Sequence, residues 1–298
     1  MVRAIDGHVH LYPPEVNRDP VAWAAAHGES HWATLCTRRR DGRPVQAFPA
    51  PAVLLAAMDA ADVERAILLG WYWEAPASCA RQNRFYAACL REHPDRFSAF
   101  ATLHPAAGQP EVEAELRRAR DEGFCGLGEL SPHTQGYGWN NPVLGAALGL
   151  AAEWGWPVNL HAADPEGRPY PGRVPTPLED FLALAQRHPA VSFVLAHWGG
   201  LLPLRRPDAA VPGNIYYDTA ASPLIYAPEV WGWMLGAVGA DRVIFGSDFP
   251  LNLYPRLDPE PNLARFAAEA RAALPGPALA AVLRENVRAL AKLPNGGA

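Results

Sequence analysis

Eight short apolar runs alternate with segments of helical pattern along most of the chain, and this alternation limits the fold more than any other feature. Near-continuous apolar strands separated by helices are typical of a parallel sheet that helices cover on both faces. Eight such units in 298 residues predict one α/β domain, a (β/α)8 barrel of the TIM type. An open doubly wound sheet is the alternative. The predicted strands are residues 2–9, 66–69, 97–103, 124–130, 157–160, 191–196, 215–217 and 243–245.

Signals that start and stop helices lie between these strands. Pro110 predicts the start of a helix, and Gly123 predicts its end. Residues 176–179 read Thr-Pro-Leu-Glu, which is the pattern of a capping box with Thr176 as the N-cap. These signals support the alternation of strands and helices.

Residues 11–50 interrupt the alternation. They contain prolines, tryptophans and a basic run at residues 38–40, but no sustained periodicity. We therefore predict a long loop inserted after the first strand of a single domain that spans residues 1–298. This segment could act as a lid over an active site, or its tryptophans could form a subunit interface in a homo-oligomer.

The charge of the chain argues against a nucleic-acid partner. Lys and Arg total 26 against 31 Asp and Glu, a net charge of −5, and no basic stripe is present to follow a phosphate backbone. The chain has no apolar run near the ~18 residues of a membrane span, and its first residues lack the apolar region of a signal peptide. A cytoplasmic protein that acts on a small molecule, without a membrane partner, is the prediction.

Ionisable residues lie at the C-terminal ends of several predicted strands. In a barrel these ends form the rim that carries the active site, so side chains from distant segments can meet around one point. Histidine and carboxylate ligands of this kind suit a zinc ion, and manganese or iron could use the same ligands. The residues at these positions are His8, His10, Glu129, His161, His197 and Asp248.

The pair His8 and His10 lies on one face of the first predicted strand, because strand side chains alternate. Taken alone, two histidines in this spacing are more often polar surface than metal ligands. Asp6 shares the same face, and we expect it to orient one of the imidazoles, since metal-bound histidines usually donate their other N–H to an acceptor.

Asp248 ends an apolar run, where an unpaired carboxylate would be costly, so we predict a metal-binding or proton-transfer role; a helix N-cap is the alternative.

Five short segments, spread from the first residues to the last predicted helix, form an ordered set. They are Ile5-Asp6-Gly7-His8-Val9-His10, Asn159-Leu160-His161, Ala196-His197-Trp198-Gly199-Gly200, Phe245-Gly246-Ser247-Asp248-Phe249-Pro250 and Asn286-Val287-Arg288-Ala289-Leu290. This set resembles the amidohydrolase superfamily, and within it amidohydrolase family 2, which includes aminocarboxymuconate semialdehyde decarboxylase and related hydrolases. The resemblance implies a distorted barrel.

The resemblance also implies roles for individual residues. It implies that His8, His10, His161 and Asp248 bind a divalent metal, and that His197 transfers protons or is a further ligand. Many relatives bridge two metals with a carboxylated lysine on strand four, where this chain has Glu129 instead; its one lysine is Lys292. Three roles stay open for Glu129: it bridges a second ion, contacts substrate or pairs with an arginine.

The predicted reaction is hydrolysis of a small lactone, ester or amide by metal-activated water, with Asp248 or His197 as the proton acceptor. Non-oxidative decarboxylation of a small carboxylic acid on the same metal is the leading alternative. A TatD-like metallo-nuclease is a further alternative, which the acidic charge disfavours. A zinc-stabilised binding module without catalysis is the last.

Substrate contacts are predicted from residues near the same rim. Trp71 and Trp73 follow the second predicted strand and could wall an apolar pocket, although aromatic residues there are equally often packing residues. Arg256 is predicted to clamp a substrate carboxylate, and Arg168 and Arg173 are weaker candidates for the same role.

Overall fold

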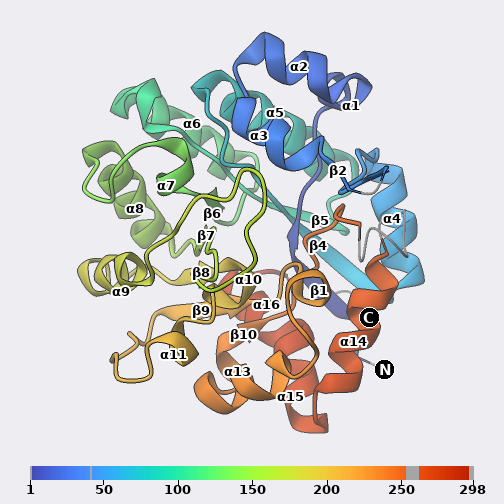
Figure 1. The fold of residues 1–298 in the computed structure, drawn as a ribbon. Helices are drawn as coiled ribbons and strands as arrows, with labels where there is room; N and C mark the ends of the chain where they lie inside the picture. The colour runs from blue at the N-terminus through green and yellow to red at the C-terminus, as the bar shows by residue number, and fades with distance from the viewer. Residues whose placement is uncertain (1, 41, 253–261, 295–298) are drawn as a thin grey trace.

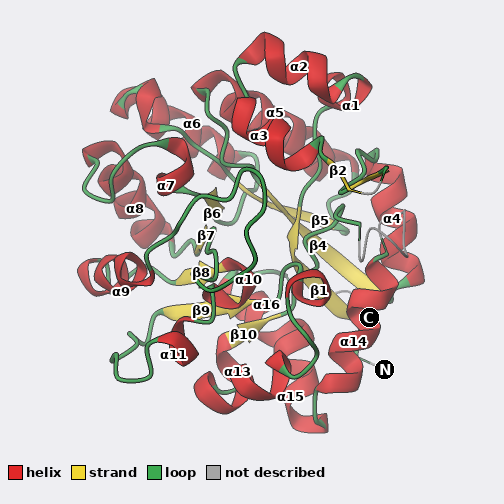
Figure 2. Cartoon of the chain, in the orientation of Figure 1, coloured by secondary structure: helices red, strands yellow, loops and turns green. Residues whose placement is uncertain are grey.

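Parallel strands form the centre of the computed structural model, which describes residues 2–40, 42–252 and 262–294, and helices surround them (Figures 1 and 2). Each predicted strand is present, so the predicted α/β fold is confirmed. Within the described residues, eight strands belong to this centre: β1 (Ala4–Val9), β4 (Val63–Leu69), β5 (Phe97–Phe100), β6 (Leu127–Leu130), β7 (Val158–Leu160), β8 (Phe193–Leu195), β9 (Ile215–Asp218) and β10 (Val243–Ile244).

The strands pair as two parallel sheets, in the orders β1-β4-β5 and β10-β9-β8-β7-β6. Backbone contacts join the sheets at both seams, through bridges between Ala101 and Leu127 and between Val9 and Phe249. A further hydrogen bond of 2.9 Å runs from Gly7 N to the carbonyl of residue 245. The strands therefore surround a common axis as a distorted barrel, and their C-terminal ends lie on one rim.

Amphipathic helices cover the outside of the barrel. In α6 the buried side chains Val112, Leu116 and Ala119 recur every three or four residues and face the strands. The main covering helices are α4 (Pro51–Ala60), α5 (Pro76–Glu92), α6 (Gln109–Asp121), α8 (Pro142–Trp154), α9 (Leu178–Arg187), α13 (Val230–Val238), α14 (Leu263–Ala273), α15 (Gly276–Ala280) and α16 (Asn286–Leu290). Short helical turns follow several strands: α7 (Pro132–Gln135), α10 (Ala196–Gly199), α11 (Leu202–Arg205) and α12 (Ser222–Ile225).

The predicted capping box at residues 176–179 is wrong in detail. Helix α9 begins at Leu178, and no side chain caps it. The hydroxyl of Thr176 instead accepts a hydrogen bond from Ala163 N at 2.7 Å. Thr176 thus fixes the loop between β7 and α9, because a tertiary partner outcompetes the local capping contact.

The segment after β1 is not an irregular loop, contrary to the prediction. The described part of residues 11–50 contains α1 (Pro14–Arg18), α2 (Pro20–His27), α3 (Ser30–Cys36) and a small hairpin of β2 (Arg39–Arg40) and β3 (Arg43–Pro44). These helices are too short to show a clear period and depend on packing with the rest of the fold. Figure 1 shows them beside α5, outside the ring of strands. A role as a lid stays a prediction.

Aromatic side chains anchor this segment. Trp32 is buried, and its ring centroid lies 5.3 Å from those of both Tyr12 and Trp73.

We expect Trp32→Ala to lower the free energy of unfolding by about 3–5 kcal/mol, because it leaves a large cavity. Urea denaturation measures this loss. The matched control is Trp233→Ala: that side chain is 56% exposed, and its loss should change stability by less than about 0.5 kcal/mol. Equal effects of the two substitutions would contradict this account of the packing.

No helix in the described part of the chain combines the length and apolar character that crossing a membrane requires.

Candidate metal centre

Six ionisable side chains meet at the C-terminal rim of the barrel, as the sequence predicted. All are buried except His161, whose side chain is 14% exposed. The residues come from the ends of five different strands: His8 and His10 from β1, Glu129 from β6, His161 after β7, His197 after β8 and Asp248 after β10.

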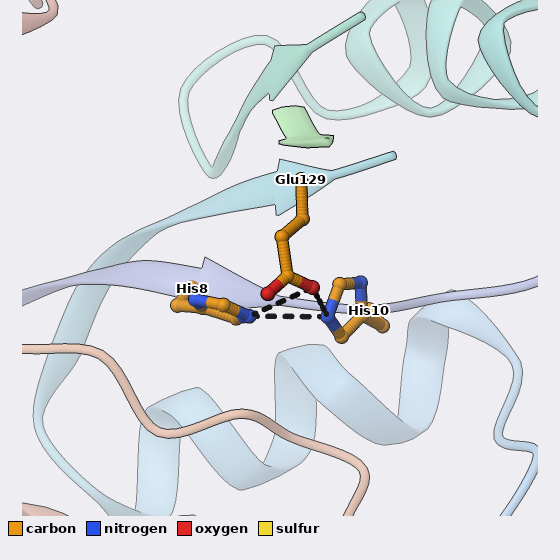
Figure 3. Close-up of side chains that lie close together, drawn as sticks. All are labelled: His8, His10 and Glu129. Atoms are coloured by element: carbon orange, nitrogen blue, oxygen red, sulfur yellow. Dashed lines mark hydrogen bonds and ion pairs between the residues drawn. The ribbon is translucent and has the colours of Figure 1, made fainter. Parts of the chain in front are cut away.

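The first group consists of His8, His10 and Glu129 (Figure 3). Asp248 lies close to both histidines of this group. The two Nε2 atoms lie 3.1 Å apart. Glu129 Oε2 is 3.9 Å from Nε2 of His8 and 3.6 Å from that of His10. Asp248 Oδ1 lies 3.7 and 3.5 Å from the same two nitrogens.

The outer nitrogens of both imidazoles face hydrogen-bond acceptors. Nδ1 of His8 lies 2.9 Å from Asp218 Oδ2, and Nδ1 of His10 lies 3.0 Å from the carbonyl oxygen of Leu69. Each Nδ1 is therefore assigned the proton, which leaves a lone pair on each Nε2. Two lone pairs and two carboxylate oxygens then face one point, and this donor set fits a divalent cation.

The second group consists of Glu129, His161 and His197. Glu129 Oε1 lies 2.9 Å from Nδ1 of His161 and 3.8 Å from Nε2 of His197. Nδ1 of His197 lies 3.1 Å from the carbonyl oxygen of Ala220, so we assign it the proton and leave Nε2 free to bind. The structure thus groups His161 with His197 and not with the β1 histidines, and Glu129 belongs to both groups.

Burial and neighbouring charges shift the pKa values of the ionisable groups at the rim in different directions. Burial alone would lower the pKa of His8, but Asp218, Asp248 and Glu129 outweigh it and raise the pKa to about 10. Burial, reinforced by His8, lowers the pKa of His10 to about 3. Burial would raise the pKa of Glu129, yet the imidazoles, led by that of His161, hold it well below its usual value. Glu129 therefore carries negative charge that a bound cation would balance.

Unusual backbone conformations present two of these side chains. His197 has a φ of 55° and Asp248 a φ of 64°, in the left-handed region that residues with a Cβ rarely adopt. In such a turn the side chain leaves the chain in a direction that a regular strand or helix would not give. Strained backbone of this kind clusters at functional sites.

Asp6 does not orient an imidazole, contrary to the prediction. Its carboxylate accepts hydrogen bonds from Ser247 N at 2.9 Å and from the Ser247 hydroxyl at 2.5 Å. It also accepts one from the backbone N–H of His8 at 3.2 Å. Asp6 therefore ties β1 to the segment that presents Asp248. The acceptor that faces the His8 ring is Asp218.

Asp218 is a residue that the sequence analysis missed. It ends β9 and is fully buried. Burial would raise its pKa, but contact with His8 outweighs burial and lowers it. The sequence did contain a signal for it, because Asp218 follows the apolar run of residues 215–217, and Asp248 was singled out for its place after the apolar run of residues 243–245.

The two tryptophans that were predicted to contact substrate lie in different surroundings. Trp71 lies beside the centre, with its ring 5.1 Å from His10, and stacks on Tyr72, whose ring lies 5.1 Å from His161. Trp73 packs among the aromatic residues of the inserted segment, where its Nε1 donates to Gln82 Oε1.

Of the predicted arginine clamps, the structure describes Arg168 and Arg173, and neither is seen to act as a clamp at the metal centre. Arg173 donates to the carbonyl oxygens of Gly167 and Asp164, so it holds its own loop together. Arg168 is exposed. Arg256 lies outside the described residues.

A sequence profile of amidohydrolases matches residues 5–292. The chain belongs to the amidohydrolase family. The resemblance predicted from the five segments is confirmed, and this amidohydrolase is an enzyme of a metal-dependent family.

Solved structures share the fold of this amidohydrolase at low sequence identity. A 5-carboxyvanillate decarboxylase from Novosphingobium aromaticivorans, complexed with manganese and 4-hydroxy-3-methoxy-5-nitrobenzoic acid, is 17% identical with a TM-score of 0.74; the match covers 97% of this chain and 96% of that one. A 2,6-dihydroxybenzoate decarboxylase from Rhizobium is 20% identical with a TM-score of 0.65, over 98% and 99%. A putative 2-pyrone-4,6-dicarboxylic acid hydrolase from Pseudomonas putida is 18% identical with a TM-score of 0.65, over 98% of each chain.

Proposed function

We propose that this amidohydrolase hydrolyses a small lactone, ester or amide, and that Glu129 and the residues on either side of it would hold two divalent metal ions. One observation carries the proposal: the two oxygens of Glu129 face two different sets of imidazole nitrogens. Oε2 faces the Nε2 atoms of His8 and His10, and Oε1 faces His161 and His197. A carboxylate shared in this way is suited to a two-metal site.

Bound divalent ions would lower the pKa of a bound water to ~7 and polarise the substrate carbonyl. His8, His10 and Asp248 would hold one ion, and His161 and His197 the other, with Glu129 between them. Zinc suits this mixture of imidazoles and carboxylates. Manganese, present in the 5-carboxyvanillate decarboxylase structure, is the alternative.

Asp248 is proposed as the group that moves the proton. Burial raises its pKa well above the usual value, although His8 opposes this and Glu129 reinforces it. A carboxylate whose affinity for protons is raised can accept the proton of the attacking water and return it to the leaving group. His197 has its Nδ1 bound to a backbone carbonyl and its Nε2 turned toward Glu129, so we assign it to metal binding.

Decarboxylation of a small carboxylic acid is the second candidate. The observation in its favour is that two of the three structural relatives named above are decarboxylases of aromatic acids. They share the fold at 17–20% identity, which leaves the reaction of this chain open. The second group of imidazoles around Glu129 favours hydrolysis, because two ions would supply positive charge to both the attacking and the leaving oxygen.

A substrate panel separates the two reactions. Zinc-loaded protein is incubated with lactones, esters and amides, and separately with 2,6-dihydroxybenzoate and 5-carboxyvanillate. We expect release of acid from one or more members of the first set, without release of carbon dioxide from the second. The Asp248→Asn protein serves as the control for contaminating activity. Carbon dioxide release without any hydrolysis would replace the proposed reaction with the second candidate.

A further inference from the structure

We propose that Asp218 is a positioning residue that organises both halves of the metal centre. It would fix the proton on His8 and hold the backbone turn that presents His197. The proposal rests on the proposed metal centre but not on hydrolysis. Asp218 faces His8 through its carboxylate, and in the proposed function neither it nor its Asn159 neighbour binds an ion.

The carboxylate of Asp218 receives four hydrogen bonds inside the barrel. Oδ2 accepts from Nδ1 of His8 at 2.9 Å and from Nδ2 of Asn159 at 2.8 Å. Oδ1 accepts from the backbone N–H groups of His197 and Ala220, both at 3.0 Å. Since the side chain is fully buried, water cannot replace these contacts.

These bonds reach both groups of the centre. The bond to Nδ1 of His8 leaves the Nε2 lone pair turned toward the first group. The bond to His197 N fixes the residue whose left-handed φ of 55° begins the turn after β8. His197 then places Nε2 in the second group, 3.8 Å from Glu129. One carboxylate on β9 therefore controls a ligand of each group.

Asparagine cannot replace Asp218 without conflict, because all four partners of the carboxylate are donors. If the amide nitrogen occupied the Oδ2 position, it would meet His8 and Asn159, and His8 could accept its hydrogen bond only with the proton moved to Nε2. If it occupied the Oδ1 position, it would meet the two backbone N–H groups. With the amide nitrogen at the Oδ2 position, Nε2 of His8 no longer offers a lone pair to the first group. With the amide nitrogen at the Oδ1 position, the contact with the backbone of His197 is lost.

The test compares zinc affinity in the full-length Asp218→Asn and unsubstituted proteins by titration against a competing chelator. We expect zinc binding to weaken by about 10–100-fold, the usual effect of losing a partner that orients a ligand. The matched control is Glu29→Gln. Glu29 is also a fully buried carboxylate and accepts from the backbone N–H groups of Glu74 and Ala75 at 2.8 and 3.1 Å, away from the centre. Its loss should lower thermal stability without changing zinc affinity. Unchanged affinity in Asp218→Asn would overturn the proposal.

A second measurement needs no substitution, in case Asp218→Asn fails to fold. In zinc-loaded protein labelled with ¹⁵N-histidine, His8 should bind zinc through Nε2 and carry its proton on Nδ1. Zinc bound through Nδ1 of His8 would overturn the proposal. If the unsubstituted protein binds zinc in this way but turns over no substrate, the proposed reaction fails while the role of Asp218 stands. If it binds no zinc, the metal centre itself fails, and the role of Asp218 fails with it.

Discussion

Glu129→Gln is expected to reduce bound zinc from two ions per chain to one or none and to lower kcat/KM by about 10²–10³-fold. The expected loss is of the size seen when one group that stabilises transition-state charge is removed. The physical reason is that an amide offers one acceptor oxygen, whereas the Glu129 carboxylate turns a different oxygen to each group of imidazoles. Metal analysis after gel filtration, together with steady-state kinetics, measures both effects.

The matched control is Glu285→Gln. Glu285 is an exposed glutamate whose side chain is 54% accessible, and it lies in the helical segment that precedes α16. It should keep the metal content and activity of the unsubstituted protein. Two tightly bound zinc ions and undiminished turnover in Glu129→Gln would contradict the bridging role.

Removal of metal is expected to abolish turnover and to lower stability. With the ions gone, the carboxylates and imidazoles of the first group face one another without a metal ion between them. Each zinc ion should stabilise the folded protein by about 4 kcal/mol when free zinc is 1,000 times its Kd. Dialysis against a strong chelator, followed by calorimetry and activity measurements, tests this expectation.

Readdition of zinc to the metal-free protein is the control for irreversible damage, and it should restore both activity and melting temperature. Manganese is added in a parallel sample, since the same ligands could accept it. Activity and stability that persist in fully metal-free protein would remove the metal from the account.

The positions of the site residues could be predicted because they depend on local rules. Alternation along β1 puts His8 and His10 on one side, and a parallel barrel brings the C-terminal ends of its strands to one rim. The division into two groups could not be predicted, since it depends on which oxygen of Glu129 faces which imidazole. That arrangement arises only when the strands are closed into a ring.

Tertiary contacts also explain the wrong predictions. Asp6 lies on the face of His8, but Ser247, far along the chain, occupies its carboxylate. The helices within residues 11–50 are stabilised by the burial of aromatic side chains such as Trp32. They were not predicted because their sequences show little periodicity. Asp218 was missed because the predicted strand ended at Tyr217, one residue before its functional side chain.

Anomalous diffraction from crystals of the zinc-loaded protein, recorded at the zinc absorption edge, is the most direct test of a two-metal centre. The account predicts two peaks at the C-terminal rim. One should lie among His8, His10 and Asp248, the other between His161 and His197, with an oxygen of Glu129 bound to each. A single peak without Glu129 among its ligands, or none at this rim, would contradict it.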